Sequence, residues 1–136
     1  MKAQLATVLL TLSTPALSDP ALCPLLGKWK SDAARTLADI VANQAMSPRS
    51  MSAFSNNFFG HMTHEWTCAE FRAWFDYHDP GEFGPYQIRE SDAESMLVNF
   101  PDGAENDLRL VFEGTCYKIR SARQKYHEYF CPVTQQ

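Results

Sequence analysis

The chain has 136 residues, a length that allows one domain. Its formal net charge is −4 at pH 7, and its 12 Lys and Arg residues form no run along the sequence. The chain is therefore a poor candidate for nucleic-acid binding, and no basic run points to an anionic membrane surface. Nine Phe, five Tyr and three Trp residues supply enough aromatic surface for a packed core, which excludes a disordered tail.

The first segment has the pattern of a signal peptide, which we place at residues 1–18. Lys2 is followed by a short apolar run at residues 5–12, and Ala16-Leu17-Ser18 fits a small-x-small cleavage site. This run is far shorter than the roughly 20 apolar residues that span a bilayer. The sequence therefore predicts a periplasmic or secreted protein without a membrane span, with residues 19–136 as its single domain.

Four cysteines follow this segment. An even number of cysteines in an exported chain predicts two disulfides, for which there are three connectivities. No Cys-x-x-Cys pair is present, so we do not expect a zinc site. The four cysteines are Cys23, Cys68, Cys116 and Cys131.

The first elements of this domain are predicted to be one strand and two short helices. The strand covers residues 26–30, and the helix at residues 33–45 has apolar side chains at i, i+4, i+7 and i+8. Ser47 and Pro48 are typical of the start of a second helix, and Gly60 stands where that helix should end.

From His61 onward the pattern becomes one of strands with β-type aromatic residues and alternating polarity. We expect Gly114 to be a bulge within one strand that continues through Cys116. The sequence thus predicts a mainly β fold, a small antiparallel barrel of about seven strands with a helix-turn-helix between strands one and two. The strand-like segments are 61–67, 71–77, 86–90, 95–100, 108–113 with 116–120, and 126–133.

The last hairpin favours one disulfide pairing. If its turn centres between Arg123 and Gln124, then Cys116 lies opposite Cys131. The Cβ atoms of directly opposed residues on antiparallel strands are close enough for a disulfide. We therefore predict the pairs Cys116–Cys131 and Cys23–Cys68.

The segment Gly27-Lys28-Trp29 resembles the opening Gly-x-Trp of the calycin superfamily, which includes lipocalins and fatty-acid-binding proteins. The helix-turn-helix after the first strand is similar to the lid of the fatty-acid-binding branch, and small exported bacterial lipocalin-like domains share the layout. The resemblance implies a barrel, with Gly27 and Trp29 as its structural signature, and a small apolar or amphipathic ligand. It implies no particular binding residue, because His127-Glu128-Tyr129 stands where that branch has an Arg-x-Tyr clamp.

Two polar clusters were weighed as catalytic or metal sites. On a strand His61 and His64 point to opposite faces, and their order differs from the His-Glu-x-x-His motif, so we expect no metal site. Asp76 and Asp79 flank His78, but Asp79-Pro80-Gly81 is a strong turn signal. No nucleophile elbow, phosphate loop or dinucleotide motif occurs, so we predict no catalytic residue, no enzyme and no cofactor.

Two functions remain. The first is a binding protein that holds a small apolar or amphipathic ligand between the helices and the sheet. The alternative is a protein-interaction module, such as an inhibitor or accessory subunit of the cell envelope, with a filled barrel and an exposed apolar patch. The candidate cavity lining, whose members are more simply explained as core residues, comprises Met51, Phe54, Phe58, Trp66, Trp74 and Tyr86.

Overall fold

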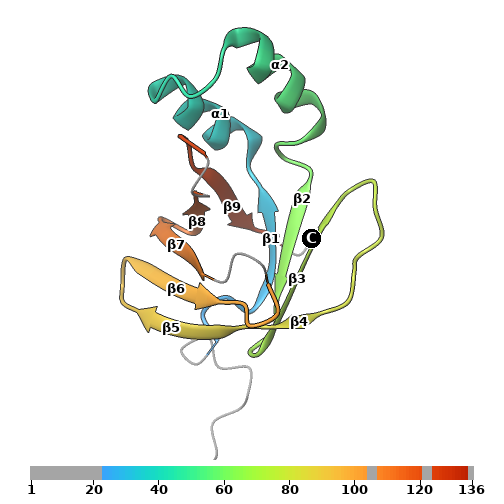
Figure 1. Cartoon of the computed structure of the whole chain (residues 1–136), viewed down its shortest axis with the longest axis vertical. Helices are drawn as coiled ribbons and strands as arrows, with labels where there is room; N and C mark the ends of the chain where they lie inside the picture. The colour runs from blue at the N-terminus through green and yellow to red at the C-terminus, as the bar shows by residue number, and fades with distance from the viewer. Residues whose placement is uncertain (1–22, 104–106, 121–123, 135–136) are drawn as a thin grey trace, which may run out of the picture.

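The computed structural model describes residues 23–103, 107–120 and 124–134. Within these ranges nine antiparallel strands form one sheet that curls into a nearly closed barrel, and two helices lie at one end of it (Figure 1). The mainly β class is confirmed, whereas the expected count of about seven strands is wrong. The predicted signal peptide, residues 1–18, lies outside the described residues.

The sheet is an up-and-down arrangement in which neighbours in sequence are neighbours in space, with the order β4-β3-β2-β1-β9-β8-β7-β6-β5. The strands are β1 Gly27–Ser31, β2 Met62–Trp66, β3 Glu70–Phe75, β4 Gly84–Pro85, β5 Gln87–Ser91, β6 Ser95–Asn99, β7 Asp107–Glu113, β8 Cys116–Ile119 and β9 Glu128–Pro132.

Two local features explain the higher strand count. Strand β4 has only two residues, one of them a proline, so no alternating pattern announces it. The expected bulge at Gly114 is instead a hairpin: Glu113 pairs with Cys116, and Gly114 turns the chain with a φ of 62°. A left-handed backbone is inexpensive for glycine, and it reverses the chain here, so one predicted strand becomes β7 and β8.

The two edge strands of the sheet, β4 and β5, are joined by a single residue, Tyr86. Its N–H donates to Ala69 O at 3.0 Å and its hydroxyl donates to Thr67 O at 2.7 Å. The ring is buried among the core side chains. The chain therefore passes directly from one edge of the sheet to the other, and this covalent step brings the barrel near closure.

Both helices begin at residues that accept hydrogen bonds from the first turn. The Asp32 carboxylate accepts the Arg35 N–H at 3.1 Å before α1 (Ala33–Ala42), and Ser47 Oγ accepts the Ser50 N–H at 3.2 Å before α2 (Pro48–Asn57). Helix α1 is also bound to β9 and to the residue before it, because Thr36 Oγ1 accepts the Tyr129 N–H and the Asp39 carboxylate accepts the His127 N–H.

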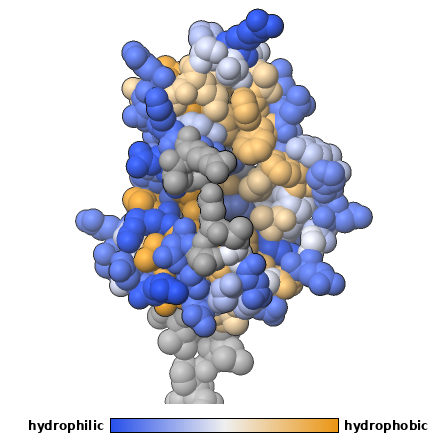
Figure 2. All heavy atoms as spheres, in the orientation of Figure 1, coloured by the Kyte–Doolittle hydropathy of each residue, from blue (hydrophilic) through white to orange (hydrophobic). Residues whose placement is uncertain are grey.

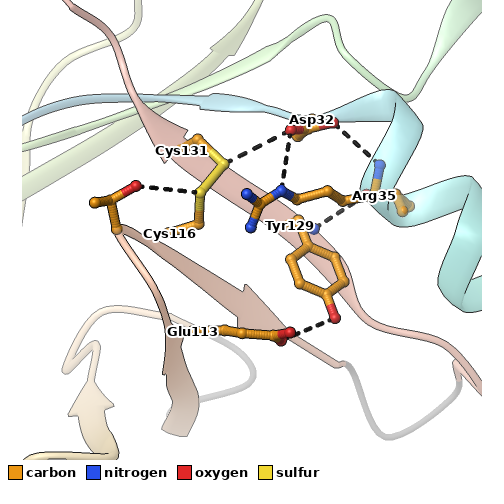
Figure 3. Close-up of a disulfide and its surroundings, with 8 residues drawn as sticks. Asp32, Arg35, Glu113, Cys116, Tyr129 and Cys131 are labelled. Carbon is orange, nitrogen blue, oxygen red and sulfur yellow. Dashed lines mark hydrogen bonds and ion pairs between the residues drawn. A yellow bond between two sulfur atoms is a disulfide. The ribbon is translucent and has the colours of Figure 1, made fainter.

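Both predicted disulfides are confirmed, Cys23–Cys68 and Cys116–Cys131. In the last hairpin Tyr117 lies opposite Phe130, which is the register that the Cys116–Cys131 disulfide requires. Figure 3 shows the second disulfide beside the start of α1, where Arg35 forms an ion pair with Asp32. In the described ranges, neither helix is long and apolar enough to cross a membrane.

Candidate functional site

The interior of the barrel is occupied by large side chains. Trp29 and Tyr117 pack with ring centroids 4.7 Å apart, and the Trp66 and Tyr86 rings meet edge to face at 5.0 Å. Packing of this kind stabilises a core and takes up the volume that a ligand would need. The buried cluster consists of Leu25, Trp29, Trp66, Tyr86, Met96, Val98, Leu110, Tyr117 and Phe130.

A polar network lies inside this apolar cluster. The Trp66 indole N–H donates to the Tyr117 hydroxyl at 3.1 Å, and that hydroxyl lies 2.7 Å from His64 Nδ1. An indole N–H can only donate, so the Tyr117 oxygen accepts from it and keeps its own proton available for His64 Nδ1. Burial lowers the pKa of His64 to about 3, which keeps its ring neutral and able to accept this bond.

A second buried polar group lies where the helices return to the barrel. Ser31 Oγ donates to the Glu128 carboxylate at 3.0 Å and accepts the Gly60 N–H at 2.9 Å. Burial raises the pKa of Glu128 to about 7, against the opposing effect of the Ser31 hydrogen bond. This chain of contacts connects β9, β1 and the end of the helical insertion.

The six residues of the predicted cavity lining lie in three separate places. Trp66 and Tyr86 are in the core, and Trp74 lies on β3 with the Arg72 guanidinium 5.2 Å from its ring centroid. On α2, Met51 faces α1, whereas Phe54 lies with Phe58 beside Tyr77. The structure thus brings Met51 and the two phenylalanines onto the helical insertion but not into one cavity with the strand residues.

The largest apolar hollow among those described is a groove between α1 and α2, which we call the interhelical groove. It has a volume of about 650 Å³ and is open to solvent. Figure 2 shows hydrophobic atoms gathered on the part of the surface where Figure 1 places the helices. The lining residues carry no charge: Leu37, Ala38, Val41, Ala42, Pro48, Met51, Ser52 and Ser55.

The sequence pattern pointed to only part of this groove. The i, i+4 spacing identified Leu37 and Val41 as part of one apolar face of α1. In the structure Val41 is 60% exposed and Leu37 only partly buried. On α2 the sequence pointed to Met51, which does line the groove, whereas Pro48, Ser52 and Ser55 carry no local signal of a binding surface and join the lining through the packing of the two helices.

The polar motifs of the sequence are separated by the sheet. His64 is buried, whereas His61 lies outside the core with its Nδ1 3.2 Å from the Asp76 carboxylate. A hydrogen bond from Lys30 holds the pKa of Asp76 below its usual range. Within the described ranges, no group of three or more His, Cys, Asp or Glu side chains is close enough to hold a metal ion.

Comparison of the chain with protein-family models, with curated proteins and with solved structures finds no match.

Proposed function

We propose that this protein is an exported protein-interaction module whose interhelical groove holds an apolar helical segment of a partner protein. The observation that carries the proposal is the open, uncharged groove on the helices, found together with a barrel filled by its own side chains. Export is supported by the two disulfides and by the signal-like segment at residues 1–18.

The form of the groove favours a helix as its occupant. Two helices of ten residues, each roughly 15 Å long, flank it and leave it open to solvent. An amphipathic helix fills such a groove with apolar residues at i, i+3, i+4 and i+7. The lining offers no charged group and only the hydroxyls of Ser52 and Ser55, so the buried face of the partner must be apolar.

A small apolar or amphipathic ligand in the same groove is the second candidate. Its support is the volume of about 650 Å³, which lies in the range of small-molecule sites. Such sites normally enclose most of the ligand surface, however, and a groove this open encloses less. We therefore place the protein partner first.

The experiment compares two probes on the full chain. A fluorescent model peptide with leucines at i, i+3, i+4 and i+7 represents the partner helix, and a fluorescent fatty acid represents the small ligand. Val41→Asp places a charge in the groove, and Val133→Asp makes the same change at a valine that is 47% exposed elsewhere. We expect saturable peptide binding that Val41→Asp weakens at least about tenfold and Val133→Asp leaves unchanged.

The outcomes separate the candidates. Fatty-acid binding without peptide binding, if sensitive to Val41→Asp, would replace the first proposal with the second. If neither probe binds, or if Val41→Asp and Val133→Asp weaken binding equally, the groove is not a binding site. Size-exclusion chromatography of both variants identifies self-association as the occupant if only Val41→Asp changes the mass.

We also propose a relationship to the calycin superfamily. It is supported by the up-and-down sheet order, by the position of Gly27 and Trp29 on β1, and by the two helices that follow that strand. Trp29 closes against the core, where its indole N–H donates to Leu25 O at 2.8 Å.

A further inference from the structure

A small pocket with cationic walls lies across β7, the end of β8 and the start of β9. We call it the cationic pocket. It has a volume of about 170 Å³, and its described lining contains no acidic residue. Its cations are separated along the chain, so no local sequence pattern indicates it. The lining residues are Arg109, Val111, Lys118, Arg120 and His127.

Strand register brings these side chains together. Val111 pairs with Lys118, so Arg109, two residues before Val111, shares a face with Arg120, two residues after Lys118. On the other side Ile119 pairs with Glu128, which brings Arg120 beside His127. Like charges opposite each other on neighbouring strands are destabilising, so this row departs from the arrangement that stability alone would favour.

The neighbouring acids neutralise only part of this charge. Arg109 pairs with Glu90 at 3.1 Å, and Lys118 pairs with Glu113 at 3.1 Å. The Tyr129 hydroxyl also donates to Glu113, as Figure 3 shows, so this carboxylate is shared between two donors.

His127 Nδ1 lies 3.6 Å from the Asp39 carboxylate on α1. Arg120 has no ion-pair partner among the residues that the structure describes, and it is exposed. The pocket therefore keeps one guanidinium whose charge nothing described compensates, next to a second guanidinium and an ammonium group.

The size and geometry of the pocket fit one anionic group rather than a whole molecule. Its volume is well below the roughly 300–1,000 Å³ of typical small-molecule sites. Guanidinium groups bind phosphate oxygens through paired N–H donors, and an ammonium adds a point charge. Since the whole chain has a net charge of −4, a generally anion-attracting surface is not the explanation for this cluster.

We propose that the cationic pocket, through Arg109, Lys118 and Arg120, binds a phosphate group, either free in solution or carried by a phospholipid headgroup. This site is separate from the interhelical groove, because the two share no lining residue. Binding here thus adds an anionic ligand to a protein whose interhelical groove is apolar.

The first arm of the test is an NMR titration of the full chain with inorganic phosphate at constant ionic strength. We expect saturable shift changes at β7, β8 and β9, and at least a tenfold weaker affinity for Arg120→Gln. The matched control is Arg89→Gln, which removes the same charge from an exposed arginine on β5, outside the pocket lining. Equal weakening by both substitutions would show general charge attraction and overturn the site.

The second arm distinguishes the two sources. Vesicles of phosphatidylcholine alone are compared with vesicles that also contain phosphatidic acid, in a sedimentation assay with the same two variants. The site is assigned to a lipid headgroup if the protein sediments with phosphatidic-acid vesicles, Arg120→Gln abolishes this sedimentation and Arg89→Gln preserves it. Phosphate binding without sedimentation assigns it to the free ion, and absence of both signals overturns the proposal.

Discussion

Tyr117 is the residue on which the polar part of the core depends. Its hydroxyl accepts from the Trp66 indole and donates to His64, so one oxygen satisfies two buried nitrogens. Its ring also packs on Trp29 and on Phe130. Burial raises the pKa of Tyr117 above its ordinary value, so the hydroxyl keeps its proton and remains a donor.

We expect Tyr117→Phe to lower the free energy of unfolding by about 2 kcal/mol, because the ring remains while two buried nitrogens lose their partner. Denaturant unfolding measures this loss. Tyr77→Phe is the control, since it removes a hydroxyl that donates to Asn57 O at 3.2 Å on the surface. If Tyr117→Phe lowers the free energy of unfolding no more than Tyr77→Phe does, the buried hydrogen bonds of Tyr117 do not stabilise the core.

At the scale of elements, the helical insertion is joined to the barrel at Gly60. Its backbone has a φ of 86°, and a Cβ built there would lie 3.2 Å from the Ala33 Cβ at the start of α1. Its N–H donates to Ser31 Oγ on β1. The insertion therefore returns to β2 by a step that only glycine makes without strain.

We expect Gly60→Ala to destabilise the protein by roughly 1–2 kcal/mol, the cost of a left-handed backbone for an L-residue. Gly81→Ala is the matched control, because its backbone is not left-handed and nothing lies within 4 Å of the added Cβ. Thermal unfolding of both variants measures the difference. Equal melting temperatures of the two variants would show that the backbone at position 60 does not require glycine.

The sequence allowed the elements with strong local signals to be predicted. Apolar spacing pointed to the first helix and Ser47 with Pro48 to the start of the second, near their observed bounds, and alternation pointed to most strands. Strand β4 could not be predicted, because Gly84–Pro85 is a strand only through its pairing with β3. The turn at Gly114 was misread because a glycine after an alternating segment fits a bulge and a hairpin equally well.

The two candidate sites depend on tertiary geometry more than the helices and strands do, so less of them could be predicted from the sequence. Of the aromatic residues that were candidates either for a cavity lining or for the core, Trp66 and Tyr86 lie in the core, and the groove is lined mainly by small residues of α1 and α2. The cationic pocket arises from the register of β7, β8 and β9, in which residues 109 and 120 meet. No local pattern carries that information.

At the scale of the whole molecule, two buried groups oppose each other in their response to pH. The raised pKa of Glu128, about 7 against 4.5, means that the native state holds its proton more firmly than the unfolded state, so stability falls as pH rises through this window. The lowered pKa of His64, about 3 against 6.5, has the opposite sign, so its contribution to stability rises with pH. The two slopes largely cancel where the windows overlap.

The substitution Glu128→Gln removes one of these two opposing pH dependences and so tests whether they cancel. Glutamine can still accept from Ser31 but carries no charge, so we expect the variant to gain about 3 kcal/mol relative to the wild type between about pH 4 and about pH 8. Urea unfolding at both pH values measures the change, with Glu94→Gln at an exposed position as the control. A difference that does not vary with pH would refute the assignment of a raised pKa to this carboxyl.

The positions of the two disulfides divide the barrel into unequal parts. Cys23–Cys68 ties the segment before β1 to the turn between β2 and β3, and Cys116–Cys131 joins β8 to β9, whereas the stretch from β4 to β7 contains no cysteine. If this stretch detaches in a local opening, the cross-linked part retains α1 and α2 and with them the interhelical groove. The cationic pocket loses Arg109 and Val111 in the same event, so capture of phosphate and local opening of the barrel exclude each other.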